Sequence, residues 1–207
     1  MNMSWIDWII ELQAIAQIGL HYSNDDYNLK HFTRIREIAA DMMSKITDFP
    51  VETVKDLFCN ETGYQTPKID ARAVVIRNDK ILLVKENPVN TDANTNTWAL
   101  PGGWVDINES VKSNTIKKVR EETGLEVTPM RLIAIQDRNR HNKPKYAYSV
   151  CKIFILCNIK FGTQETPEND FFDIGALPEL ANEINTFSQI HMCYKAYYDN
   201  KWVVQFD

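Results

Sequence analysis

Acidic side chains and glycines recur at fixed intervals in one stretch of the chain, and their types suit a metal ion held against a phosphate. Glu109 is followed by the neighbouring pair Glu121 and Glu122, and a Gly102–Gly103 turn precedes all three. The glycines would let the backbone approach a ligand closely and offer a carbonyl oxygen. Such oxygen ligands are the ones that Mg²⁺ prefers, and the cation can neutralise phosphate oxygens and position water.

This stretch resembles the Nudix box, whose pattern is G-x5-E-x7-R-E-U-x-E-E-x-G-U with U an apolar residue. The matching positions are Gly103, Glu109, Val119, Glu121, Glu122, Gly124 and Leu125. The run from Trp98 to Gly103 also stands where the family has a strand and a turn leading into the box. So many fixed residues over so long a spacing form a far more specific signal than a lone G-x-G-x-x-G motif.

The resemblance implies a hydrolase that cleaves a pyrophosphate with the help of Mg²⁺ or Mn²⁺. It implies that Gly103, Glu109, Glu121 and Glu122 hold the metal, and that Glu121 and Glu122 are also catalytic. The alternative is that the two adjacent glutamates form an ordinary charged helix face that pairs with neighbouring lysines. The surrounding box favours the metal site.

Two lysines depart from the pattern. Lys117 replaces the Arg of the box, which keeps the charge but loses the bidentate fork of a guanidinium. Lys118 replaces the first helix Glu, which the resemblance makes a principal metal ligand or base. Positions 118, 121 and 122 share one helix face, so a charged ammonium there would repel a cation or hold Glu122 or a substrate phosphate. The fold inference survives this change, whereas full catalytic competence does not follow.

A compensating carboxylate could come from the loop after the long predicted strand. Glu165, Glu168 and Asp170 lie there, where several Nudix enzymes place an extra metal ligand or general base. We favour Glu168 as this catalytic residue. For any one of the three, a solvated loop acid is the simpler interpretation.

Further polar residues could contact the substrate. Arg138 and His141 follow a predicted strand and could bind phosphate or base, although an ordinary polar loop explains them equally well. Arg72 on the first strand could face the ligand or extend to solvent. Trp104 follows the Gly-Gly turn and could contact the ligand or pack over the turn. With Lys118, these are the predicted substrate-binding residues.

The first third of the chain predicts helices. Apolar residues recur at helical spacing from Trp5 to Ile18, after Ser4 as an N-cap. A second apolar stripe runs from Phe32 to Ile46, and Pro50 opens a short third helix. Short amphipathic helices cannot bury their stripes alone, so they must pack on one another, on the rest of the chain or on a second subunit.

We therefore expect a small helical domain over residues 1–62. Trp5, Trp8 and Tyr27 are expected in its core or in a dimer interface, because their spacing is helical. The helices suggest a homodimer.

The remainder, residues 68–207, predicts an α+β fold in which a mixed β-sheet lies between helices. A hairpin is expected at 77–80, and a polar loop at 87–97. Strands are expected at 71–76, 81–84, 98–100, 130–136, 148–159 and 171–174. Helices are expected at 109–122, ending at Gly124, and at 188–198. Cys151 and Cys157 share strand parity with Ile153 and Ile155 and are expected on one buried face.

Composition excludes several classes of protein. A net charge of −5 argues against a nucleic-acid binder, which would show a basic field. The four cysteines form no C-x-x-C pair, so we expect free thiols in a reducing compartment. The N-terminus lacks the features of a signal peptide, and no apolar run could span a bilayer. We expect a cytoplasmic protein that does not bind membranes.

The helical region before the box, with the run from Ala134 to Arg138 and His141, resembles one Nudix branch: the bacterial ADP-ribose or CDP-choline pyrophosphatase-like group. This resemblance covers nearly the whole chain and implies cleavage of an X-linked nucleoside diphosphate to a nucleoside monophosphate and phospho-X. The alternative is a catalytically weakened nucleotide sensor, because Lys118 replaces a box Glu. An RNA-end nuclease fits the acidic balance least well.

Overall fold

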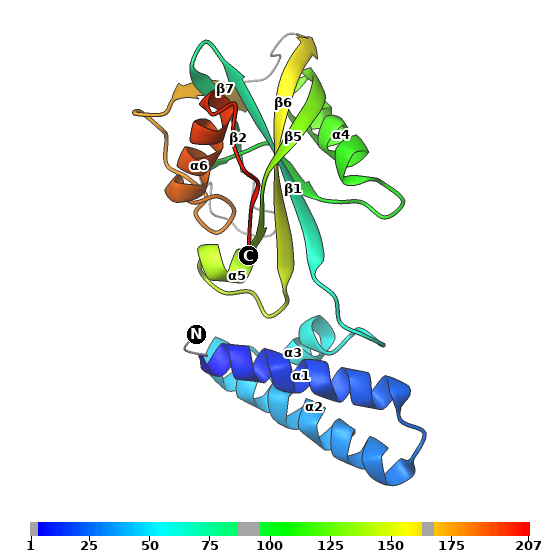
Figure 1. Ribbon diagram of the computed structural model, residues 1–207. Helices are drawn as coiled ribbons and strands as arrows, with labels where there is room; N and C mark the ends of the chain where they lie inside the picture. Colours follow the sequence, from blue (N-terminus) through cyan, green and yellow to red (C-terminus); the bar gives the residue numbers. More distant parts are fainter. Residues whose placement is uncertain (1–3, 87–95, 163–167) are drawn as a thin grey trace. The chain divides into compact units, whose positions relative to one another are not determined.

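The computed structural model describes residues 4–86, 96–162 and 168–207, and the chain divides into two compact units (Figure 1). The helical unit comprises residues 1–67 with 145–149. The sheet unit comprises residues 68–144 with 150–207.

Three helices make up most of the helical unit: α1 (Trp5–Tyr22), α2 (Asp26–Thr47) and α3 (Val51–Phe58). Asp7 fixes the start of α1 by accepting the Ser4 backbone N–H at 2.8 Å and both Lys145 Nζ contacts at 2.6 Å. Asp25 caps α2 by accepting the Asn28 backbone N–H. A small shared core holds the helices together: Ile9, Ala39, Ala40, Met43, Val54 and Phe58.

Of the two expected places for Trp5, Trp8 and Tyr27, the core is wrong, and the dimer interface stays a prediction. Trp5 is 65% exposed and Tyr27 is 70% exposed, and Trp8 is also exposed. Part of the apolar surface of α1 and α2 therefore meets solvent in the single chain.

The sheet unit is built on a mixed sheet in the order β3-β2-β1-β6-β5-β8, with β4 paired to β1 and β7 paired to β2. The pairs β1–β6 and β5–β8 are parallel, and the others are antiparallel. The strands are β1 (Lys68–Arg77), β2 (Lys80–Lys85), β3 (Trp98–Ala99), β4 (Gly102–Trp104), β5 (Glu126–Asp137), β6 (Val150–Phe161), β7 (Asn169–Asp173) and β8 (Gln205–Phe206). The predicted α+β fold with a mixed sheet is confirmed.

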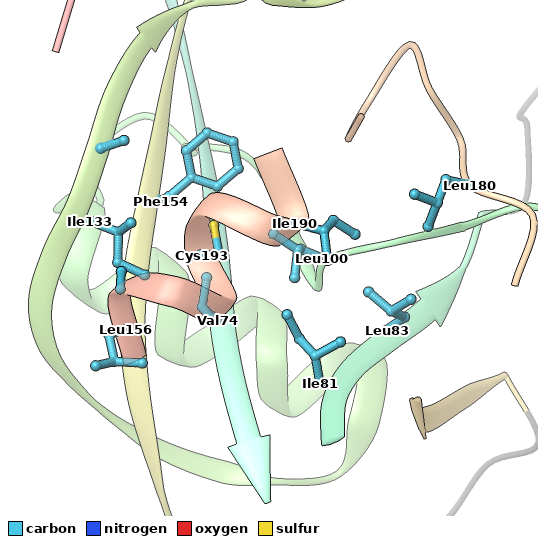
Figure 2. Close-up of a cluster of buried hydrophobic side chains, with 12 residues drawn as sticks. Val74, Ile81, Leu83, Leu100, Ile133, Phe154, Leu156, Leu180, Ile190 and Cys193 are labelled. Atoms are coloured by element: carbon cyan, nitrogen blue, oxygen red, sulfur yellow. The ribbon is translucent and has the colours of Figure 1, made fainter. Parts of the chain in front are cut away.

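Alternate residues of the strands point to opposite sides of the sheet, and a helix covers the apolar side chains on each side. On one face, α6 (Phe187–Tyr198) packs over Val74, Phe154 and other apolar residues of the central strands (Figure 2). On the other face, α4 (Val111–Thr123) packs over Val75 and Ile155. Cys157 is buried on this second face and Cys151 packs against it, as expected. The site therefore lies on a rigid two-faced scaffold.

The predicted elements are found with their ends shifted by a few residues; α4, for example, begins at Val111 rather than at Glu109. Ser110 caps α4 by accepting the Ser113 backbone N–H at 3.0 Å, and Gly124 ends the helix in the left-handed conformation. The hairpin at 77–80 turns through Asn78 and Asp79, both at positive φ. The 87–95 part of the expected loop lies outside the described residues. The Gly102–Gly103 turn is corrected, because both glycines belong to β4.

Candidate active site

Glu122 lies at the end of α4, and its side chain turns toward the start of β4. Its Oε2 accepts the backbone N–H of Gly102 at 2.8 Å. Burial raises the pKa of Glu122 to about 7, with a further contribution from Glu86, while Arg72 and Lys118 oppose the shift. The ionised Glu122 carboxylate is therefore poorly solvated, and a bound cation would favour its ionised form.

Gly102 allows this contact because β4 lies tightly against β1. Its φ is +132°, and a Cβ at this position would lie 2.1 Å from the carbonyl oxygen of Ala71. A Cβ on Gly103 would meet nothing within 4 Å. The first glycine is thus required by the strand pairing, whereas the second leaves open space beside the box.

The outer face of α4 carries the two lysines that depart from the family pattern. Lys118 Nζ lies 3.5 Å from Glu121 Oε2, and Lys117 Nζ lies 3.0 Å from Asp106 Oδ2. Hydrogen bonding to Lys117 is the main cause of a lowered pKa for Asp106. The predicted shared face of positions 118 and 121 is confirmed by their contact. Lys118 therefore neutralises a carboxylate of the box.

Glu109 precedes α4 and reinforces its start. Its Oε2 accepts the Ser113 hydroxyl at 2.5 Å. Among the described residues, the structure holds no group of three His, Cys, Asp or Glu side chains arranged as a metal site. Mg²⁺ does not need one, since it is commonly bound by one or two carboxylates together with substrate phosphates. The hard oxygen donors Glu121 and Glu122 fit that mode.

A buried charge cluster lies on the α6 face of β1, close to Glu122. Asp70 accepts from Arg72 Nε at 2.9 Å and from Lys152 Nζ at 2.8 Å. Arg72 Nη1 lies 3.4 Å from Glu86 Oε1 and donates to the Leu100 carbonyl at 3.0 Å. Burial is the first cause of the raised pKa of Glu86 and of the pKa of about 8 for Lys152.

Sequence reasoning identified only Arg72 of this cluster and missed Asp70, Glu86 and Lys152. Charged residues at alternate positions of an otherwise apolar strand, Asp70 and Arg72, were the available signal. The structure places the Arg72 guanidinium against protein groups.

The other expected substrate residues lie in varied surroundings. Arg138 is 1% exposed and donates to the carbonyls of Glu183, at 3.0 Å, and of Pro144. His141 Nε2 lies 2.9 Å from Asp207 Oδ2. Both residues belong to α5 (Arg138–His141), a short helix that the sequence did not predict.

Trp104 and the acidic loop residues are more exposed. Trp104 is 45% exposed at the end of β4, directly after the glycine pair. The Glu168 side chain is exposed, while its carbonyl accepts the Lys85 N–H at 2.7 Å. Asp170 is exposed on β7, and Glu165 lies outside the described residues. Glu122 thus binds the Gly102 N–H, and Lys118 pairs with Glu121. The contact of Glu168 with β2 is made by its backbone carbonyl.

Comparison with known proteins agrees with this arrangement. A family model described as the NUDIX domain matches residues 67–184. A second model, described as "UDP-X-like, N-terminal oligomerisation domain", matches residues 3–58. The chain belongs to the Nudix family. It is a pyrophosphohydrolase with an N-terminal helical region.

Individual relatives cover most of the chain. It is 36% identical over 198 residues to the Bacillus subtilis (strain 168) protein named "Putative ADP-ribose pyrophosphatase YjhB", covering 94% of this chain and 92% of the relative. An ADP-ribose pyrophosphatase structure from Streptococcus suis 89-1591 is 40% identical with a TM-score of 0.60, over 69% of this chain and all of that one (100%). A UDP-X diphosphatase structure is 25% identical, covers 97% of each chain and has a TM-score of 0.60.

Proposed function

We propose that the chain hydrolyses an X-linked nucleoside diphosphate, of the ADP-ribose or CDP-choline type, to a nucleoside monophosphate and phospho-X. The observation that carries the proposal is the buried Glu122 carboxyl, which accepts the Gly102 N–H at 2.8 Å and whose pKa burial raises to about 7. A carboxylate fixed in this way favours a divalent cation and, through it, a pyrophosphate.

Glu122 and Glu121 are the proposed carboxylates for Mg²⁺ or Mn²⁺, with Glu109 and the Gly103 carbonyl assisting. A cation bound there would neutralise the phosphate oxygens and help to ionise the attacking water. Glu122, fixed by Gly102, keeps its carboxylate in one orientation. Lys118 Nζ lies 3.5 Å from Glu121 on a half-exposed face of the helix. It can exchange this partner for a phosphate oxygen and neutralise that oxygen's charge.

The proton of the attacking water needs an acceptor. We keep Glu168 as the proposed base, because its side chain is exposed and its backbone is anchored to β2. Trp104, 45% exposed next to the box, is a proposed contact for the base or the X group. Arg72, Arg138 and His141 stay weaker candidates for substrate contact, because each already binds protein groups.

The ADP-ribose arm of the proposal is supported by the names of the Bacillus and Streptococcus relatives. The name of the UDP-X diphosphatase adds uridine nucleotides to the compounds to be tested. CDP-choline rests on the sequence resemblance alone.

We also propose that the chain forms a homodimer through its helical unit. The support is the match to an oligomerisation domain and the exposed aromatic residues Trp5 and Tyr27. No helix among the described residues is long and apolar enough to cross a membrane. The cytoplasm is the proposed compartment, in keeping with four free cysteines.

The deciding experiment measures monophosphate release from ADP-ribose, CDP-choline and UDP-linked compounds, with Mg²⁺, with Mn²⁺ and with EDTA. We expect turnover of at least one compound, abolished by EDTA. Binding of a nucleotide without turnover in any metal would instead support the sensor that the Lys118 replacement suggests.

A further inference from the structure

The backbone N–H and the backbone carbonyl of Leu100 are each held by a buried side chain. Its N–H donates to Asn185 Oδ1 at 2.9 Å, and its carbonyl accepts from Arg72 Nη1 at 3.0 Å. Leu100 and Asn185 are both 0% exposed. These hydrogen bonds are shielded from water, so no solvent molecule would replace a missing partner without cost.

Two residues further along, the same backbone contacts the box. The Pro101 carbonyl accepts the Ala73 N–H at 2.8 Å, and the Gly102 N–H donates to Glu122 at 2.8 Å. Only a few backbone dihedral angles between Leu100 and Gly102 can rotate, and the ring of Pro101 fixes its own φ. The Pro101 carbonyl and the Gly102 N–H belong to one planar peptide group, so the hydrogen bond from Ala73 and the position of the preceding Leu100 backbone together set the direction of the Gly102 N–H.

Asn185 is itself rigidly placed, at the end of a segment whose carbonyls accept from buried donors. Arg138 donates to the carbonyl of Glu183, and Lys152 donates to that of Ile184. The Asn185 N–H donates to Ala181 at 2.8 Å. Asn185 lies one residue beyond the matched NUDIX region, 67–184, so the family model assigns it nothing.

We propose that Asn185 is a positioning residue for the box: through Leu100, Pro101 and Gly102 it orients the Glu122 carboxylate. The side chain acts through its oxygen alone, since Asn185 Nδ2 is buried and has no hydrogen-bond partner in the described part of the chain. An aspartate would keep this acceptor oxygen, and a leucine of similar size would remove it.

The test compares Asn185→Leu with Asn185→Asp in the full chain. The first readout is the Gly102 amide resonance in ¹⁵N-labelled protein and its hydrogen exchange, which needs neither substrate nor metal. Asn185→Leu is expected to move the amide proton upfield and to speed its exchange roughly 10-fold. Asn185→Asp is expected to restore both toward the wild-type values.

The second readout is kinetic and rests on the proposed function. Asn185→Leu is expected to lower kcat roughly 10- to 100-fold with KM nearly unchanged, because a misplaced catalytic group loses rate more than binding. Trp202→Phe is the matched control, since it removes another hydrogen bond to backbone in the same unit, from Trp202 Nε1 to the Ile133 carbonyl at 2.9 Å.

An unchanged Gly102 amide in Asn185→Leu would overturn the proposal, as would equal changes in Trp202→Phe. If Asn185→Leu does not fold, Asn185→Ala takes its place with the same expected signs. If no nucleotide is hydrolysed, the amide measurements alone decide the role of Asn185, so failure of the proposed function remains a separate result.

Discussion

The sheet unit contains two groups of charged side chains within reach of Glu122, and they differ in almost every physical respect. The buried charge cluster consists of Asp70, Arg72 and Lys152, with Glu86, whose side chain is 27% exposed, at its edge. The charged face of α4 consists of Lys117, Lys118 and Glu121, and Lys117 pairs with Asp106 of the preceding loop. Asp70 pairs at 2.8 and 2.9 Å with side chains that are at most 9% exposed, whereas Lys118 and Glu121 are 3.5 Å apart and 26% and 47% exposed.

This difference indicates which charged side chains can exchange a protein partner for a ligand. A buried ion pair that loses a partner is strongly destabilised, so its members keep their protein contacts. An exposed pair contributes little and can exchange partners at low cost. Glu122 experiences both groups, since Arg72 and Lys118 each lower its pKa against the effect of burial. The buried charge cluster therefore keeps its protein partners, whereas the charged face of α4 can exchange its partners at low cost.

The largest expected effect is on the residue between the two groups. Glu122→Gln should lower hydrolysis on the order of 10³-fold, because several kcal/mol of charge stabilisation at the phosphates are lost. The amide can still accept the Gly102 N–H, so the fold should persist, as circular dichroism would check. Activity within a few-fold of wild type would remove Glu122 from the mechanism.

Asp70→Asn tests the rigidity of the buried charge cluster. It leaves Arg72 and Lys152 buried without their carboxylate and should lower the free energy of unfolding by about 3–5 kcal/mol. The control is Asp173→Asn, which breaks an exposed pair with Lys80 at 3.3 Å on the same sheet and should cost less than about 1 kcal/mol. Equal losses in urea unfolding would erase the distinction between buried and exposed pairs.

The burial of Glu122 also predicts a pH dependence of stability in EDTA. Its folded pKa is raised from 4.5 to about 7, so the folded state binds the proton more tightly than the unfolded state. Stability is therefore lost as pH rises from about 4.5 to 7, by about 3 kcal/mol. Glu122→Gln should lack this decrease. The prediction is wrong if wild type and Glu122→Gln show the same change in free energy of unfolding between pH 5 and pH 8.

The sequence predicted those parts of the molecule that depend on local pattern. The end of α4 followed from Gly124, and the box followed from the spacing of glycine and glutamate, whereas the Ser110 cap was not predicted. The buried charge cluster could not be found in this way, because Asp70 and Lys152 are brought together by the parallel pairing of β1 and β6. Nothing local marks two strands far apart in sequence as neighbours.

Contacts between residues far apart in sequence also explain which predictions were wrong or missing. Gly102 and Gly103 were interpreted as a turn because glycine usually marks one, but here Gly102 permits close pairing with β1. Trp5 and Tyr27 were expected in the core or in a dimer interface; both are exposed in the single chain, so only the core alternative is wrong. Asn185 was not considered, because its partner Leu100 is 85 residues away.

The smallest expected effect concerns the charged face of α4 itself. Lys118→Glu exchanges a cation for a carboxylate next to Glu121 and Glu122, and should raise Mn²⁺ affinity roughly 10-fold, with a faster hydrolysis rate. Lys112→Glu is the matched control, since it makes the same charge change on an exposed residue in the first turn of the helix. Long-range attraction would affect both variants alike and be screened by salt. A gain confined to Lys118→Glu, measured by electron paramagnetic resonance of free Mn²⁺, would locate the cation beside position 118. Equal gains in the two variants, or none, would place position 118 outside the metal site and leave the lysine as a solvated partner of Glu121.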